Sequence, residues 1–193
     1  MLRAPAVSLG ADRSIHLSDP VLAGSDVAAT GYALAKTLEQ ESPDLVLLGQ
    51  QSDNGECYTI GAVVADHLGM PSLTQVIKMD VEGESLRCER QAEYGYDTVQ
   101  VQTPAVISVG DAINEPRYPS LKAIMGAKKK PLQAMTAADA GIDAGKVGGE
   151  NSAAQWTAAK APPAKASGEI IEDEDTGETV EKILAWLDER KLI

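Results

Sequence analysis

The sequence predicts an α/β domain built on a parallel sheet, extended by an antiparallel meander and followed by a long C-terminal arm. Apolar runs at 45–48 and 104–110 lack alternating polar residues, which is typical of parallel strands covered on both faces. Segments with helical spacing separate the early strands, so right-handed crossovers should make those strands parallel. Short strands follow one another from Leu73, and an Ala-, Gly- and Pro-rich stretch comes later.

The first half of the chain is expected to alternate strands and helices. Residues 13–17 predict a short strand, and apolar positions behind a cap at Asp26 predict a helix over 26–40. The run at 45–48 suits a central parallel strand. A second helix is expected from Ile60, and a glycine and a proline end it.

The second half changes character. The segments 73–79, 84–91 and 97–102 predict short strands joined by glycine-containing turns, and 104–110 predicts a buried strand. We therefore expect one α/β domain over residues 1–147. An extended arm over 148–193 should end in an amphipathic helix at 178–191, whose apolar stripe needs a surface to pack on.

Composition argues against several classes of function. The formal net charge is −12, with 17 Lys+Arg against 29 Asp+Glu, and nucleic-acid binding needs concentrated positive potential. The cysteines and histidines lack metal-site spacing, so no metal is expected and a reduced, cytoplasmic setting is favoured. We expect no membrane insertion, because no signal peptide is evident and no apolar run approaches the ~20 residues of a span.

The loop after the strand at 45–48, with the sequence QQSDNGECYTIG, is the strongest local candidate for a ligand site. Ligands of open α/β sheets bind beyond the carboxyl ends of the strands, where a helix N-terminus offers N–H groups to a phosphate. The loop is neither a Walker A nor a GxGxxG motif, and an ordinary βα loop is the alternative. Cys57 is either a thiol of lowered pKa or a small buried packing residue.

The turn ERQAEYGYD is the other place where charged side chains gather. Its carboxylates could in principle form an acid–base pair. Charged residues at a hairpin turn are usually a solvated edge, so we assign no catalytic residues.

The segment NEPRYPSLKAIMGAKKK, residues 114–130, is a basic exception in an acidic chain. Pro116 and Pro119 favour an extended backbone, and a short helix can begin near Ser120, which would project Leu121 outward. A single exposed leucine or a run of lysines usually carries no function. Their combination on a proline-fixed loop is typical of a docking element, an apolar anchor ringed by charge that steers an acidic partner.

These segments together carry a family resemblance. The stretch PAVISVGDAINEPRYPSLKAIMGAKKKPL, preceded by ERQAEYGYDTVQVQ and by DLVLLGQQSDNGECYTIGAVVADHLGMP, resembles the β subunit of electron-transfer flavoproteins. NEPRY followed by L..IM.AKKK is a specific signature of that family. The resemblance spans nearly all of the chain. Family members usually begin upstream with a strand and a helix, so we expect domain 1–147 to lack both, and with them one wall of the nucleotide pocket.

The resemblance implies a Rossmann-like, adenine nucleotide α hydrolase-like fold, with the terminal helix packed on a partner. That partner would be an α subunit holding most of the FAD, while the β subunit binds AMP or, in bifurcating versions, a second FAD. Electrons would pass from dehydrogenases, commonly the acyl-CoA dehydrogenases of fatty acid oxidation, to a downstream quinone oxidoreductase. The chain would then be an electron-carrier subunit and not an enzyme.

The resemblance also implies two sets of site residues. The family's nucleotide loop falls on Gly49, Gln50, Gln51, Ser52, Asp53, Asn54, Gly55, Glu56, Cys57, Tyr58, Thr59 and Ile60. Its partner-recognition loop falls on Arg117, Tyr118, Pro119, Ser120, Leu121, Lys122, Ala123, Ile124, Met125 and Gly126, with Leu121 as the anchor. Thr59 stands where many members have glutamine, which leaves phosphate contact to backbone N–H groups. Lys122 and Gly126 replace a frequent proline and lysine, so partner preference can differ.

Two other functions stay open on the sequence. A stand-alone adenine-nucleotide-binding module of similar fold would bind AMP or ATP without a partner. A scaffold that has lost the nucleotide site would still bind the α subunit.

Overall fold

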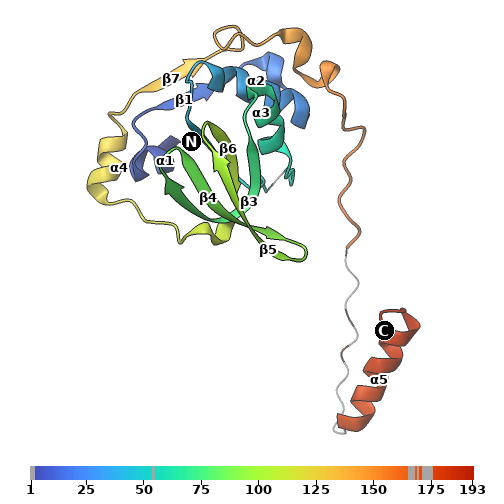
Figure 1. Cartoon of the computed structure of the whole chain (residues 1–193). Coiled ribbons are helices and arrows are strands. Elements are labelled where there is room, and N and C mark those ends of the chain that lie inside the picture. Colours follow the sequence, from blue (N-terminus) through green and yellow to red (C-terminus); the bar gives the residue numbers. More distant parts are fainter. Residues whose placement is uncertain (1–2, 54, 165–167, 169, 171–175) are drawn as a thin grey trace. The chain divides into compact units, whose positions relative to one another are not determined.

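The computed structural model describes residues 3–53, 55–164, 168, 170 and 176–193. The chain divides into two compact units, Met1–Gln155 and Trp156–Ile193. Within its described residues, the first unit holds a five-stranded sheet, a two-stranded sheet and helices α1 to α4 (Figure 1). The second unit holds helix α5.

The five-stranded sheet has the strand order β2-β6-β3-β4-β5. Strands β2, β6 and β3 are parallel, whereas β3, β4 and β5 form an antiparallel meander. This confirms the predicted α/β class, with parallel strands joined to a meander. The bounds are Leu45–Gly49 for β2, Ser72–Glu82 for β3, Ser85–Ala92 for β4, Gly95–Gln102 for β5 and Ala105–Val109 for β6.

Strand β6 lies between β2 and β3 and is buried on both faces, because alternate side chains enter different cores. Val106 packs with Val46 and with Ala65 of helix α3 (Ile60–Leu68). Ile107 faces the other way, into the core lined by the meander. A continuous apolar strand is therefore central, as its sequence pattern indicates.

The expectation that residues 45–48 form the central strand is wrong. Strand β2 lies at the edge of the sheet, and Leu47 is 54% exposed. The apolar runs in β2 and β6 look alike in sequence. Such a run indicates that a strand tends to be buried, but it does not indicate which strands will lie beside it.

Strands β1 (Ser14–Leu17) and β7 (Leu132–Met135) form a separate parallel pair. The alternating order of elements predicts β1 in one sheet with β2, but β1 pairs with β7 instead. Strand β7 escapes prediction because it is only four residues long and most of its side chains are exposed, so it has no burial pattern.

Helix α2 (Val27–Glu39) packs against this pair. Asp26 caps it, as predicted, by accepting the Ala29 N–H at 2.9 Å. The buried face of α2 shares a core with residues from β7 and from the segment after it, through Ala29, Tyr32, Ala33, Met135, Ala137 and Ile142. On its other side α2 approaches α3 closely, since a Cβ on Gly31 would lie 2.4 Å from Cγ1 of Val63.

Residues 148–154 bind back onto the start of α2. The Gly148 N–H donates to Ser25 Oγ at 2.8 Å, and the Ala154 N–H donates to the Asp26 carboxylate at 3.0 Å. Gly148 has φ +86°, and a Cβ there would lie 2.7 Å from the Val21 carbonyl oxygen. These bonds tie residues 148–154 to the rest of the first unit, Met1–Gln155.

Helices α1 (Arg3–Leu9) and α4 (Leu121–Ala127) contact each other at one side of the first unit (Figure 1). Short 3-10 turns complete the unit. They are η1 (Pro20–Leu22), η2 (Asp111–Ile113), η3 (Ala144–Lys146) and η4 (Gly149–Asn151).

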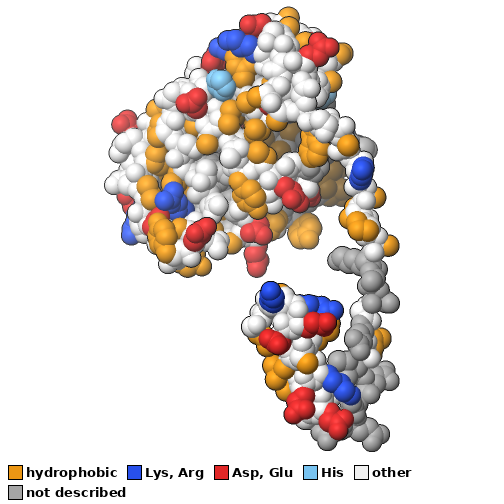
Figure 2. All heavy atoms as spheres, turned by 90° about the vertical axis from the view of Figure 1, so that its right-hand side faces the viewer, with side chains coloured by type: hydrophobic (Ala, Val, Ile, Leu, Met, Phe, Trp, Pro, Cys, Tyr) orange, Lys and Arg blue, Asp and Glu red, His pale blue; other side chains and the backbone are white. Residues whose placement is uncertain are grey.

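In the second unit, the apolar stripe of helix α5 (Thr176–Glu189) is exposed to solvent. Val180, Ile183 and Leu184 are each nearly half exposed. Figure 2 shows apolar and charged side chains side by side on the surface of this helix. Among the described helices, none has both the length and the apolar composition that crossing a bilayer requires.

Candidate functional site

The predicted nucleotide loop lies at the carboxyl ends of β2 and β6 and leads into α3. Its described residues are exposed or half-buried, and Asn54 lies outside the described residues. Gln50 extends toward the end of β6, because a Cβ on Gly110 would lie 3.3 Å from Gln50 Oε1. The loop thus lies beyond the carboxyl ends of the strands, where open α/β folds bind ligands.

Local hydrogen bonds shape the middle of this loop. Ser52 Oγ accepts the Gly55 N–H at 3.3 Å, and the Ser52 carbonyl accepts the Glu56 N–H at 2.8 Å. Glu56 has φ +43°, in the left-handed region that a residue closing a tight turn adopts. This turn brings Cys57 to the head of α3.

Cys57 and Thr59 interact at the start of α3. Cys57 Sγ lies 3.1 Å from Thr59 Oγ1. Hydrogen bonds from the Thr59 side chain and then from its backbone N–H lower the pKa of the Cys57 thiol. Cys57 is half-buried, so the alternative of a buried packing residue does not hold.

The hydroxyl of Thr59 is therefore directed to sulfur and not to the helix. Within the described residues, no side chain caps the N-terminus of α3. Gly61 lets this first turn lie close to the sheet, since a Cβ there would be 3.5 Å from the Ser108 side chain. The first N–H groups of α3 are thus left to bind water or a ligand, and they suit a phosphate.

Two hollows of the structure lie away from this loop. One, of about 340 Å³, is lined at the other end of the sheet by Glu39, Ser42, Pro43, Asp44, Leu68, Met70 and Pro104. The other, of about 330 Å³, lies beside the β4–β5 turn and is lined by Thr74, Gln75, Arg90, Gln91, Ala92, Glu93 and Tyr94. Neither includes a residue of the loop.

The charged turn between β4 and β5 forms a cross-strand ion pair. Arg90 donates to Asp97 at 2.9 Å, and the Tyr94 hydroxyl donates to the same carboxylate at 2.7 Å. The Tyr94 bond and then the Arg90 bond lower the pKa of Asp97. A carboxylate held ionised in this way suits a structural pair, in keeping with the solvated edge that the sequence predicts.

The predicted docking segment forms helix α4, and Ser120 caps it by accepting the Ala123 N–H at 3.2 Å. Its apolar side chains point outward: Leu121 is 74% exposed and Met125 63%. Tyr118, on the extended stretch before the helix, is 98% exposed. A short helix that shows this much apolar surface is typical of an interaction site.

The lysine run behaves differently from its sequence prediction. Lys128 and Lys129 are exposed, but Lys130 Nζ donates to three carbonyl oxygens of α1 and the turn after it, those of Val7, Gly10 and Ala11, at 3.1, 3.4 and 2.6 Å. Lys130 therefore holds two segments together, which a run of identical residues could not reveal.

Across the described residues, His, Cys, Asp and Glu side chains form no group of three or more that could hold a metal ion.

The comparisons with known proteins point to one family. The model for the electron transfer flavoprotein domain matches residues 2–140. The electron transfer flavoprotein subunit beta of Mycobacterium tuberculosis is 41% identical over 189 residues, covering 97% of this chain and 70% of the relative. The chain belongs to the electron transfer flavoprotein β-subunit family.

More distant relatives carry the same name or a related one. The electron transfer flavoprotein subunit beta of Thermoanaerobacterium thermosaccharolyticum is 34% identical over 189 residues, covering 97% of this chain and 72% of the relative. Subunit CarD of the caffeyl-CoA reductase-Etf complex of Acetobacterium woodii is 32% identical over 194 residues, covering 100% of this chain and 74% of CarD. Membership implies electron transfer, flavin in the complex and an α-subunit partner.

Proposed function

We propose that this chain is the β subunit of a heterodimeric electron transfer flavoprotein that carries electrons from dehydrogenases, such as acyl-CoA dehydrogenases, towards the quinone pool. Family membership supports the electron-transfer role. The observation that carries the docking part is helix α4, which turns Leu121 and Met125 to the surface and buries only Ala127. In this function the chain catalyses no reaction itself. It works in the cytoplasm, a setting that its two free cysteines support.

The α subunit is proposed to cover the apolar stripe of α5. Val180, Ile183 and Leu184 would lose their exposed surface on assembly, as expected for an amphipathic helix that has no core of its own. Arg190 lies over the Trp186 ring at 4.1 Å and helps to order this end of the helix.

The loop at 49–60 is proposed to hold the phosphate of AMP. The uncapped start of α3 fits an anion, because its N–H groups and the positive end of the helix dipole meet there. FAD, which supplies the electron-carrying ring, would be held mainly by the α subunit. A second FAD in this pocket, as in bifurcating versions of the family, is the alternative.

Co-expression of this chain with its α subunit tests the proposal. We expect a heterodimer that retains flavin on purification, and AMP or FAD released on denaturation and identified by chromatography. No complex and no flavin would reject the function. Tight AMP or ATP binding by the isolated chain, without complex formation, would instead support a stand-alone nucleotide-binding module, and a complex with an empty β pocket would support a scaffold.

A further inference from the structure

Helix α4 depends on contacts outside itself for its orientation. It has only seven residues, and of these only Ala127 is buried. Isolated helices shorter than about 12 residues are marginal in water, and most helices in proteins are stabilised by packing an apolar face. Because α4 turns that face outward, another interaction has to hold it.

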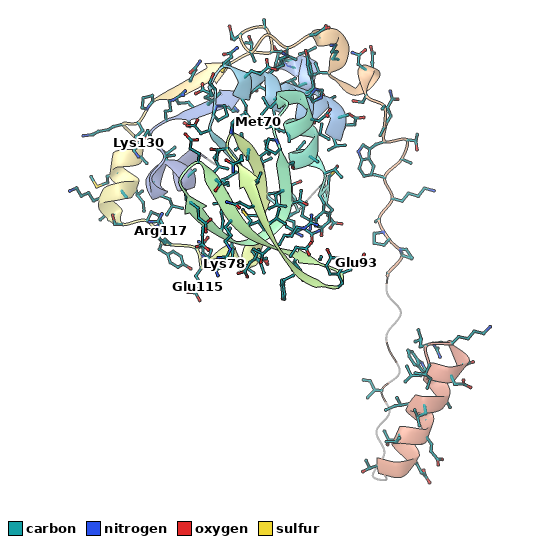
Figure 3. All side chains as sticks on the ribbon, viewed as in Figure 1. Met70, Lys78, Glu93, Glu115, Arg117 and Lys130 are labelled. Atoms are coloured by element: carbon teal, nitrogen blue, oxygen red, sulfur yellow. The ribbon has the colours of Figure 1, made fainter. Side chains whose placement is uncertain are left out.

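Both ends of the docking segment bind the C-terminal end of α1. Lys130, after α4, donates to the carbonyl oxygens of Val7, Gly10 and Ala11. Arg117, before α4, donates to the Leu9 carbonyl oxygen at a longer 3.5 Å. Figure 3 shows these two side chains at opposite ends of α4, on the side of α1.

The end of α1 is a good acceptor for these cations. The last carbonyl groups of a helix have no partner within the helix, and they form the negative end of its dipole. The Ala11 N–H satisfies the Ala6 carbonyl at 3.2 Å, while Lys130 and Arg117 reach those of Val7 and Leu9. An ammonium has three donors and a guanidinium a rigid fork, so each can bind several such oxygens.

We propose that Lys130, assisted by Arg117, is a positioning residue: by capping α1 it fixes the orientation in which α4 presents Leu121 to a partner. This rests on the proposed docking function of α4. The basic run then has two roles, since Lys128 and Lys129 are exposed and can steer a partner while Lys130 pre-organises the surface. Pre-organisation strengthens binding because less freedom is lost on docking.

The test compares Lys130→Met with Lys129→Met in the full chain assembled with its α subunit. Both variants remove one positive charge from adjacent residues, but only the first removes the contacts to α1. Hydrogen exchange of the amides of 121–127 should become about tenfold faster or more in Lys130→Met, as expected when bonds to a charged group are lost. Lys129→Met should change it by less than about twofold, because surface substitutions have small effects.

Docking gives the second measurement. Dissociation from an acyl-CoA dehydrogenase should be several-fold faster in Lys130→Met, whereas Lys129→Met should chiefly slow association at low salt. Lys130→Arg keeps the charge and the donors, so it should restore both measurements. Should Lys130→Met fail to fold, Arg117→Gln removes only the single longer bond and should speed exchange at the start of α4.

Unchanged exchange in Lys130→Met would overturn the proposal whatever the docking result. Faster exchange with unchanged dissociation would also overturn it, because α4 would then be held without affecting the partner. Failure of the unaltered complex to bind any dehydrogenase would reject the proposed function, and the exchange measurement would still decide whether Lys130 holds α4.

Discussion

Helices α3 and α4 begin at the two segments proposed to bind a nucleotide and a protein partner, and their first turns are built differently. At α4, the Ser120 hydroxyl accepts the Ala123 N–H, so a side chain from the chain itself caps the helix. At α3, the Thr59 hydroxyl interacts with Cys57 instead, and within the described residues no side chain takes its place on the helix.

This difference separates two ways of making a site. A docking helix presents side chains, so its backbone is best closed by a cap and its face left apolar and exposed. A phosphate site presents backbone N–H groups, so a cap would compete with the ligand. Both residues carry a hydroxyl at a helix N-terminus, but Ser120 closes the first turn of α4, whereas Thr59 leaves the first turn of α3 uncapped.

The largest effect should come from the docking side. Leu121→Ala should slow electron transfer from the dehydrogenase about tenfold or more, as expected for an interface hot spot, with little change in unfolding. Stopped-flow reduction of the flavin by the reduced dehydrogenase measures it. Val81→Ala is the matched control, because Val81 is an apolar side chain, 69% exposed, on the meander. Equal rates for both variants would remove Leu121 as the anchor.

Removing the residue before each helix should destabilise the capped helix α2 more than the uncapped helix α3. Asp26→Ala should lower the free energy of unfolding by about 1 to 2 kcal/mol, the usual cost of losing an N-cap. Thr59→Ala should cost less than about 0.5 kcal/mol, because no capping bond is lost. Urea unfolding of the two variants makes the comparison, and similar losses would show that Thr59 does stabilise α3.

The contribution of Asp26 to the free energy of unfolding should depend on pH in a definite direction. Hydrogen bonds from the N–H groups of Ala29 and then Ala154 lower the pKa of Asp26 below 3.8. Stability from a lowered carboxyl pKa is fully present above the unfolded value and is lost as the pH falls through the folded value. The gap between the unaltered chain and Asp26→Ala should therefore be constant near pH 7 and shrink below pH 3.8.

A smaller effect is expected on the reactivity of Cys57 when a ligand binds at the uncapped start of α3. Because the pKa of Cys57 is lowered, its thiol should react with iodoacetamide near neutral pH, and AMP at the loop should slow this reaction several-fold. Cys88 is the internal control, since it is buried and burial raises its pKa, so it should react only on unfolding. An identical Cys57 rate with saturating AMP would place the nucleotide elsewhere.

The smallest effect should come from the cap of α4. Ser120→Ala should weaken docking about threefold, because a lost N-cap costs roughly 1 kcal/mol and frays a turn that carries Leu121. Equilibrium titration of the dehydrogenase measures it, with Thr59→Ala as the variant whose docking should not change. A loss as large as that for Leu121→Ala would mean that Ser120 itself touches the partner.

Local chemistry made much of this protein predictable. The caps at Asp26 and Ser120, the meander and the exposed Leu121 all follow from residue types and their spacing over a few positions, and the structure has each of them. The loop at 49–60 was predictable as a candidate for the same reason, because a glycine-ended strand followed by a polar loop and a helix is a local pattern.

Other features were set by contacts between distant segments. The sequence alone determined the α/β class, the capped starts of α2 and α4 and the outward position of Leu121, since these depend on backbone propensity, capping residues and periodicity. Only the tertiary structure decided that β6 and not β2 is central, that β1 pairs with β7, and that Lys130 turns inward while Lys129 is exposed. The physical reason is that an apolar run or a lysine carries no record of its distant partner. For Lys130 that partner is the set of unsatisfied carbonyl groups at the end of a helix more than a hundred residues earlier.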